Sequence, residues 1–171
     1  METDAFIGGL RERLEADGHA EDTVLMLFTD HYCKYFSDAE FISAIKGETD
    51  RNMLSNVPFV IWTEGITPQV YDKYVSTMDI APTIVDLFSL DADLRYYIGN
   101  DMFGPDGGVV YFRNYAWYDG KTYDTGNDAS SNPAVLAMRE QVREQLDVSQ
   151  DTFRYDYFAY LQRRGILNPD E

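Results

Sequence analysis

Several features that would point to common protein functions are scarce in this 171-residue sequence. It has a single cysteine, Cys33, so no disulfide can form within the chain and the redox compartment stays undetermined. Basic residues are few, with 14 Lys and Arg against 30 Asp and Glu, which gives a formal net charge of -16. Because phosphate backbones are bound by clustered Lys and Arg, this charge argues against a nucleic-acid partner.

Long apolar runs are missing as well. No run approaches the ~20 apolar residues of a membrane span, and the first ten residues lack the basic and apolar regions of a signal peptide. The sequence therefore predicts a soluble chain. It also contains no Gly-x-Ser-x-Gly, Walker or Gly-x-Gly-x-x-Gly motif. What it does contain is 44% hydrophobic and 15% aromatic residues, enough for the core of one ordinary domain.

The apolar periodicity predicts an alternation of helices and strands. We expect helices over residues 3–17, 38–46, 76–90, 134–146 and 151–164. We expect strands over residues 23–29, 57–63 and 108–114, and a hairpin turn at Asp119-Gly120 between aromatic-rich strands. Ser76 or Asp79 is expected to cap the third helix, with Pro82 in its first turn.

This order of elements predicts the α/β class. Residues 1–98 form an α/β layer, and residues 99–171 form an α+β subdomain with an antiparallel hairpin and helices. The strands at 23–29 and 57–63 have no polar alternation, which is typical of strands covered on both faces in a parallel or mixed sheet. Two such strands are few for an α/β domain, where ~5–6 are usual. The chain is therefore interpreted as part of a larger sheet.

The first strand, in the stretch "TVLMLFTDHYC", runs into two good metal ligands, Asp30 and His31. Neighbouring residues in a strand point to opposite faces, so both can reach one ion only if the chain bends there. A carboxylate with an imidazole suits Zn²⁺, Mn²⁺ or Fe²⁺. The alternative is a cap-like Asp beside a surface His. The other histidine, His19, lies in a turn and is expected to be solvated, and no third ligand is placed by spacing.

Two further candidate functional features can be explained by a structural role instead. Cys33 has only His31 as a nearby base and no oxyanion motif, so a partly buried thiol is expected rather than a nucleophile. The tyrosines and tryptophan over residues 111–123 suit a sugar or polyol, but aromatic pairs on a hairpin usually stabilise the sheet.

Four stretches in order resemble the sulfatase-like enzymes of the alkaline phosphatase superfamily. They are "TVLMLFTDHYC", "NVPFVIWTEG", "VSTMDIAPTIVDLFSLD" and "YFRN" followed by "GKTYDT". The likeness covers residues 3–160 and is greatest to the C-terminal portion of lipoteichoic acid synthases and related phosphoglycerol transferases. It implies a mixed-sheet α/β/α fold, of which this chain holds part.

The resemblance also implies a chemistry. Asp30 and His31 match the family's Asp-His metal ligands, for Mn²⁺ foremost, with Mg²⁺, Zn²⁺ or Ca²⁺ as alternatives. The family's threonine nucleophile and its other ligands lie upstream of this chain, so no catalytic residue is assigned here. Thr29 and Cys33 stand where the family often has Gly. Neither is the nucleophile, and "CKYFS" is not the Cys-x-Pro/Ala-x-Arg pattern of a sulfatase formylglycine precursor.

The resulting hypothesis is a C-terminal fragment of a metal-dependent phosphoglycerol transferase, inactive alone. Its partners are the upstream catalytic half and a lipid-linked phosphoglycerol substrate. The parent is expected in a bacterial cell membrane with an extracellular catalytic domain. Two alternatives stay open: a fragment of a sulfatase or phosphodiesterase of the same superfamily, and a non-catalytic binding domain.

Overall fold

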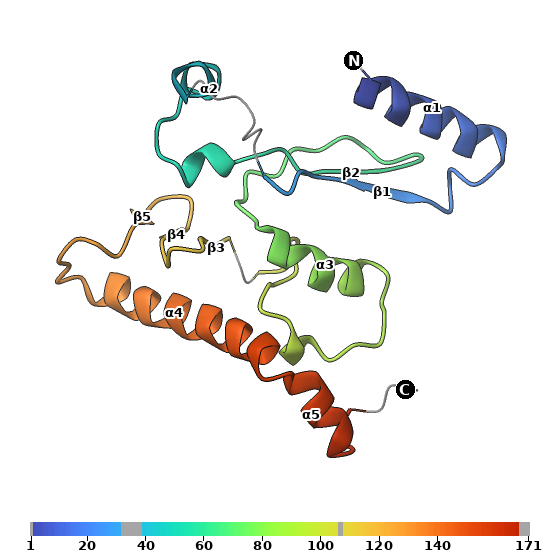
Figure 1. The fold of residues 1–171 in the computed structure, drawn as a ribbon. Coiled ribbons are helices and arrows are strands. Elements are labelled where there is room, and N and C mark those ends of the chain that lie inside the picture. The colour runs from blue at the N-terminus through green and yellow to red at the C-terminus, as the bar shows by residue number, and fades with distance from the viewer. Residues whose placement is uncertain (1, 32–38, 106–107, 168–171) are drawn as a thin grey trace. The chain divides into compact units, whose positions relative to one another are not determined.

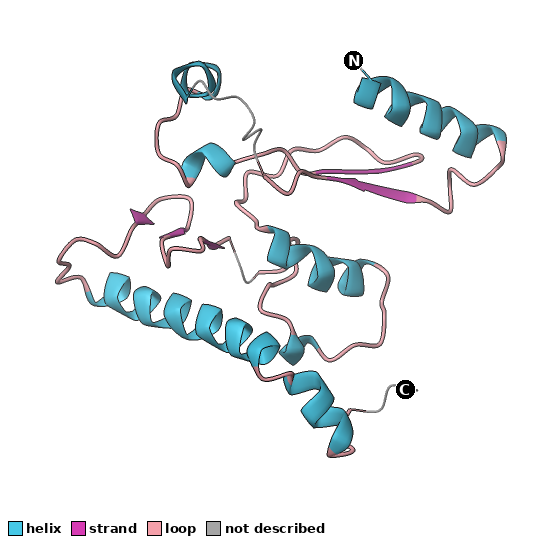
Figure 2. Ribbon diagram, viewed as in Figure 1, coloured by secondary structure: helices cyan, strands magenta, loops and turns pink. Residues whose placement is uncertain are grey.

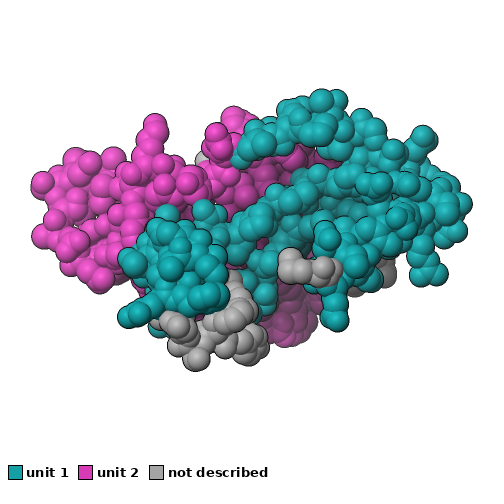
Figure 3. All heavy atoms as spheres, turned by 90° about the horizontal axis from the view of Figure 1, so that it is seen from above, with its two compact units in different colours: residues 1–71 teal, residues 72–171 magenta. Residues whose placement is uncertain are grey.

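The computed structural model describes residues 2–31, 39–105 and 108–167. It has helices and two small antiparallel sheets, which confirms the predicted α/β class (Figures 1 and 2). In the described part of the chain, no helix combines the length and apolar character needed to cross a membrane. The contacts group the chain into two compact units, residues 1–71 (unit 1) and 72–171 (unit 2), which Figure 3 colours separately.

This grouping differs from the division predicted from the sequence. The predicted boundary between residues 98 and 99 concerns the fold of a longer parent protein and stays a prediction. Within this chain the contacts change at residue 71, because the third predicted helix packs with the segment that follows it.

Unit 1 holds two strands, two α-helices and one 3-10 helix, and 3-10 helices are labelled η. Its elements are α1 (Glu2–Ala16), β1 (Val24–Leu27), α2 (Ala39–Lys46), η1 (Met53–Ser55) and β2 (Val60–Thr63). Helix α1 ends where Gly18 takes a positive φ of 74° and His19 N–H donates to the carbonyl oxygen of Leu14 at 2.8 Å.

The two strands pair antiparallel, from Val24 opposite Thr63 to Leu27 opposite Val60. The Thr63 hydroxyl adds a 2.9 Å hydrogen bond to the carbonyl oxygen of Thr23. No residue of either strand is fully buried. The expectation that both strands are covered on both faces is therefore wrong within the described residues. Two paired strands need packed layers on each face to be buried, and unit 1 supplies too little of them.

Unit 2 carries the second sheet and the longest helix. Its elements are η2 (Thr77–Asp79), α3 (Ile80–Leu87), η3 (Leu94–Tyr96), β3 (Val110–Tyr111), β4 (Trp117–Tyr118), β5 (Tyr123–Asp124), α4 (Pro133–Arg154) and α5 (Tyr157–Arg163). Its buried side chains include Val85, Met102, Ala116, Trp117, Val142 and Leu161.

A capping box starts the helical segment that contains η2 and α3. The Ser76 hydroxyl accepts from Met78 N–H at 3.2 Å, and the Asp79 carboxylate accepts from Ser76 N–H at 2.7 Å. Pro82 lies in the first turn of α3 and is buried. Both predicted capping residues therefore act together.

The predicted hairpin lies between β4 and β5. The Asp119 carboxylate accepts from the backbone N–H of Lys121 at 2.9 Å and of Thr122 at 2.6 Å, while Gly120 has a φ of 88°. The sheet order is β3-β4-β5, all antiparallel. Strand β3 covers only two of the seven residues predicted over 108–114.

The boundary between the last two helices lies further along the sequence than their periodicity predicts. Asn132 caps α4 by accepting from Ala134 N–H at 3.0 Å, and Pro133 occupies the first turn. The helix then continues to Arg154, beyond the predicted end at 146. Asp156, in the left-handed region with φ 50°, separates α4 from α5.

Candidate functional site

Asp30 and His31 follow β1, which ends at Leu27. The chain bends at both residues, so two consecutive side chains turn to the same side. Their Oδ2 and Nε2 atoms lie 3.2 Å apart. The Asp30 side chain is 82% exposed and the His31 side chain 33%. The bend therefore produces the convergence that a shared ligand requires.

The donor chemistry of this pair fits part of a divalent metal site. Two donor atoms bonded to one ion at about 2.1 Å lie about 3.0 to 3.4 Å apart at octahedral or tetrahedral angles. The Asp30–His31 separation of 3.2 Å falls in that interval. It also equals a hydrogen bond from His31 to Asp30, so it fits a shared ion without requiring one. The metal role of both residues stays a prediction.

The rest of a metal site is not found in the described residues. Among them, no group of three or more His, Cys, Asp or Glu side chains could hold an ion. His19 lies in the turn after α1, exposed as expected, and its carbonyl oxygen accepts from the Thr23 hydroxyl at 2.7 Å. The predicted state of Cys33 concerns a residue outside the described ones. A metal site needs three or four protein ligands, so this pair would supply two of them and leave at least one more to be found.

The "STMDIAPT" motif builds a second cluster, in unit 2. Beyond the capping box, the buried Asp79 carboxylate accepts from Asn100 N–H at 2.8 Å. The buried Thr83 hydroxyl donates to the carbonyl oxygen of Asp79 at 2.6 Å and accepts from Met102 N–H at 2.9 Å. These bonds fasten the segment around residue 100 to the start of α3. The motif thus has a structural role in this chain.

Comparison with known proteins identifies the family. A family model described as "Sulfatase" matches residues 1–90, which include Asp30, His31 and the "STMDIAPT" motif. The chain belongs to the sulfatase family.

Within this family, the chain is similar to lipoteichoic acid synthases. The chain is 24% identical to lipoteichoic acid synthase 2 of Bacillus subtilis (strain 168) over 92% of its length. It is 26% identical to lipoteichoic acid synthase of Staphylococcus aureus, strains USA300 and NCTC 8325 / PS 47, again over 92% of its length. It spans about a quarter of these relatives, 27% and 26% of their lengths.

The "GKTYDT" segment of this sulfatase-family chain contributes a partly buried ion pair that was not predicted from the sequence. Asp124 in β5 accepts two hydrogen bonds from the Arg139 guanidinium of α4, at 2.7 and 2.6 Å, and one from Trp117 Nε1 at 3.1 Å. The two charged side chains are only 11% and 20% exposed. The hydrogen bond from Arg139 is the main cause that lowers the pKa of Asp124 below its usual value.

A signal for this pair does exist in the sequence. Val135 and Val142 belong to the apolar periodicity by which a helix is predicted over residues 134–146, and Arg139 is four residues after one and three before the other. A charged side chain is rarely buried without a partner, so an arginine on an apolar face indicates a nearby acidic residue. Its identity depends on the tertiary fold, because Asp124 is one of many acids in the chain.

The aromatic side chains of the hairpin pack against one another rather than lining a sugar site. The Tyr118 ring meets the Tyr74 ring edge-on at 4.7 Å, and the hydrogen bond between them raises the pKa of Tyr118. Phe112 and Tyr123 form a similar pair at 6.1 Å.

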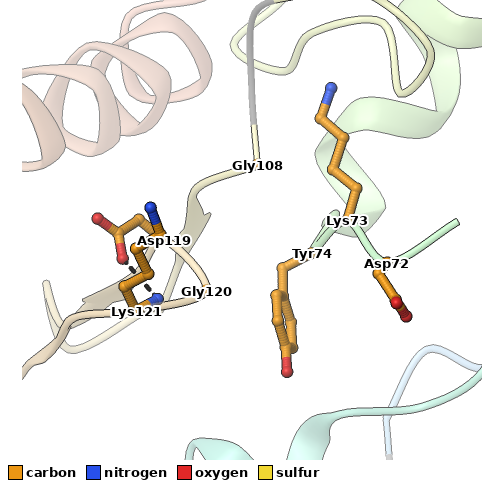
Figure 4. Close-up of a pocket in the computed structure, with 7 residues that line it drawn as sticks. All are labelled: Asp72, Lys73, Tyr74, Gly108, Asp119, Gly120 and Lys121. Carbon is orange, nitrogen blue, oxygen red and sulfur yellow. Dashed lines mark hydrogen bonds between the residues drawn. The ribbon is translucent and has the colours of Figure 1, made fainter.

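The hollow beside this hairpin has a volume of about 310 Å³ (Figure 4). Its lining includes Tyr74, Asp119 and Gly120. The Lys73 ammonium points away from the Asp119 turn and donates to the carbonyl oxygen of Gly104 at 2.8 Å. Among the described residues that line the hollow, the polar side chains of Lys73 and Asp119 therefore do not converge.

Proposed function

We propose that this chain is the C-terminal part of a metal-dependent phosphoglycerol transferase. The reaction moves glycerol phosphate from phosphatidylglycerol to a polymer or glycolipid acceptor. The similarity to lipoteichoic acid synthases over 92% of the chain supports this assignment. The observation that carries it is the Asp30–His31 pair, which lies at the end of a strand with its donor atoms 3.2 Å apart.

Asp30 and His31 are the residues that would hold the ion. Its identity is expected to be Mn²⁺, with Mg²⁺, Zn²⁺ or Ca²⁺ as alternatives. A bound divalent ion supplies Lewis acidity, which stabilises developing charge on a phosphoryl oxygen and activates a nucleophile. Asp30 contributes a negative charge and a hard oxygen. His31 contributes an imidazole nitrogen, Nε2, which lies 3.2 Å from the Asp30 carboxylate oxygen.

The nucleophile, a threonine in the resembling enzymes, belongs to the upstream half of the parent protein, so this chain alone is inactive. That half is also the proposed partner of unit 1. Helix α1 has no buried residue although Phe6, Leu10 and Leu14 form an apolar stripe. We place the parent in a bacterial cell membrane with its catalytic domain outside, where phosphatidylglycerol is the lipid-linked substrate.

The test uses the full-length parent protein. Asp30→Asn removes the charge while keeping the side chain's size. It should lower Mn²⁺-dependent release of diacylglycerol from phosphatidylglycerol by about 100-fold, and Mn²⁺ binding followed by electron paramagnetic resonance should weaken. The matched control is Asp22→Asn, an exposed aspartate in the turn before β1, which should change neither quantity.

Three results would contradict the proposal. Undiminished Mn²⁺-dependent activity in Asp30→Asn would remove the ligand assignment. Turnover of phosphatidylglycerol by the 171-residue chain with Mn²⁺ would disprove the claim that it is inactive alone. Cleavage of a sulfate ester by the parent, with no action on phosphatidylglycerol, would favour the sulfatase alternative.

A further inference from the structure

The outer face of α5 carries an ordered column of side chains. The rings of Tyr157 and Tyr160 stack at 6.1 Å between centroids with an angle of 20°. The guanidinium carbon of Arg164 lies 6.0 Å from the centre of the Tyr160 ring. These residues are spaced three and four apart, so they share one side of the helix. Both tyrosines remain exposed.

The side of α5 next to the column fixes this orientation. Leu161 is buried, and the Phe158 ring meets the Tyr96 ring edge-on at 5.9 Å. Because these contacts hold α5 to the rest of unit 2, the column cannot turn inward without breaking them. Figure 1 shows α5 following the end of the long helix α4.

Large apolar side chains lie on both sides of the column in the sequence. Phe153, in the last turn of α4, is 83% exposed, and Ile166, just after α5, is also well exposed. Isolated exposed apolar residues are ordinary, but exposed aromatic and aliphatic residues gathered within one short segment indicate a binding surface.

The charge of this segment is opposite to that of the chain. Residues 153–167 hold three arginines and one aspartate, a net charge of +2, whereas the whole chain has -16. Arg154 is paired with Asp151 at 3.4 Å. Arg163 and Arg164 form no ion pair with any residue that the structure describes. Within the described part of the chain, these two arginines are available to an anionic partner.

We propose that this surface docks the protein onto an anionic lipid bilayer. It comprises Phe153, Tyr157, Tyr160, Arg163, Arg164 and Ile166, and we call it the aromatic–arginine surface. Tyrosine rings favour the boundary between headgroups and acyl chains, arginines attract anionic headgroups, and an exposed Phe or Ile gains free energy by entering the apolar layer. A soluble polyanion would use the arginines but leave the apolar residues unused.

The large negative charge of the chain does not prevent this docking. At physiological ionic strength the Debye length is about 8 Å, so charges far from the contact are screened. The arginines at the contact lie within a Debye length of the headgroups and are attracted to them, whereas the acidic remainder of unit 2 is repelled. The charge distribution thus favours one orientation on the bilayer. This inference does not depend on the transfer reaction proposed above.

Flotation of the 171-residue chain with vesicles tests the proposal. Vesicles of equal parts phosphatidylglycerol and phosphatidylcholine are compared with pure phosphatidylcholine at about 0.15 M salt. The chain should float with the anionic vesicles. The double variant Arg163→Gln, Arg164→Gln should bind about 30-fold more weakly, from the contribution of two juxtamembrane arginines. Phe153→Ser should weaken binding several-fold at unchanged charge.

The matched control is Arg11→Gln, Arg13→Gln, which removes the same charge from exposed positions of α1. It should bind as the unchanged chain does. Circular dichroism of every variant should match the unchanged chain, since all the substituted side chains are exposed.

Three outcomes would overturn the proposal: no flotation with anionic vesicles, equal loss in the α1 control, or inorganic polyphosphate binding as tightly as vesicles with no effect of Phe153→Ser. The last would identify the partner as a soluble polyanion.

Discussion

Thr83 and Thr152 make the same local hydrogen bond, from a helical hydroxyl to the carbonyl oxygen four residues earlier. They differ in what else the hydroxyl does. Thr83 is fully buried and also accepts from Met102 N–H, whereas Thr152 is only partly buried. Comparing the two threonines therefore distinguishes the effect of the local helical bond, which adds little stability, from that of the long-range bond to Met102.

Thr83→Val keeps the shape of the side chain and removes both bonds. The buried Met102 N–H loses its acceptor, so the free energy of unfolding should fall by about 1–3 kcal/mol. Thr152→Val should change it by about 0.5 kcal/mol or less. Urea unfolding followed by far-UV circular dichroism measures both. Equal effects would contradict a long-range role for Thr83.

Two aspartate–arginine pairs of similar geometry offer a second comparison. Asp124 and Arg139 are largely enclosed, while Asp93 and Arg95 lie at the surface. Arg95 holds the pKa of Asp93 at about 2, but solvent screens an exposed pair and leaves it little effect on stability.

Asp124→Asn should lower the free energy of unfolding at pH 7 by about 1–2 kcal/mol, because the bond to Arg139 loses its charge. The pKa of Asp124 is lowered in the folded state, so its contribution is present above the unfolded pKa near 3.9 and is lost as pH falls through the lower folded pKa. The difference between the unchanged chain and Asp124→Asn should therefore shrink below about pH 4. Asp93→Asn, which keeps its cap on Arg95 N–H, should leave the unfolding midpoint unchanged at pH 7. A constant difference from pH 7 to pH 2 would contradict this assignment.

At the scale of elements, the start of α3 and the segment around residue 100 form one structure. Gly99 lies so close to this helix start that an added Cβ would overlap the carbonyl group of Met78 and lie 2.7 Å from Asp79 N. The bond from Asn100 N–H to Asp79 depends on that approach. No other residue than glycine fits there without moving the segment.

Gly99→Ala should therefore lower the free energy of unfolding by about 3 kcal/mol. Gly9→Ala is the control, because a Cβ at Gly9 meets nothing within 4 Å and alanine is favoured inside α1 by about 0.5–1 kcal/mol. Thermal unfolding should move in opposite directions for the two variants. A neutral Gly99→Ala would show that the segment is not fastened to α3.

The elements that could be predicted from sequence are those whose signals are local. The Ser76–Asp79 cap and the Asp119-Gly120 turn depend on neighbouring residues only, and both were predicted. The end of α4 was not, because nothing between residues 146 and 154 breaks a helix and Asp156 is no regular stop signal. The partner of Arg139 could not be predicted for a different reason. Strand pairing and helix packing together bring Asp124 next to it, and both depend on the tertiary fold. Asp30 and His31 come together only because the chain bends after β1, and the sequence is compatible with this bend but does not predict it.

At the scale of the whole molecule, the two units differ in how complete they are. The bonds that hold unit 2, at Asp79, Thr83 and Asp124, all run within residues 72–171. Unit 1 has no buried residue on α1 and no fully buried strand residue. Unit 2 is therefore expected to fold by itself, whereas unit 1 is expected to be less stable than it would be beside the upstream half.

A fragment of residues 72–171 tests this difference. It contains one tryptophan, Trp117, which is buried and bonded to Asp124, since Trp62 lies in unit 1. Its fluorescence should have the blue-shifted maximum of a buried indole and should change cooperatively in urea. The same fragment with Asp124→Asn should unfold at lower urea. The emission of a solvated indole in the absence of urea would show that unit 2 does not fold alone.

Asp156, the left-handed residue between α4 and α5, affects how the aromatic–arginine surface can vary among relatives. The direction of α5 depends on the backbone angles of Asp156, which contributes no side chain to the tyrosine–arginine column. Aspartate tolerates this conformation better than β-branched residues do. A relative with a β-branched residue at this position would keep every residue of the column and present it at another angle. The residues of the aromatic–arginine surface and the direction in which α5 presents them can therefore change independently among relatives.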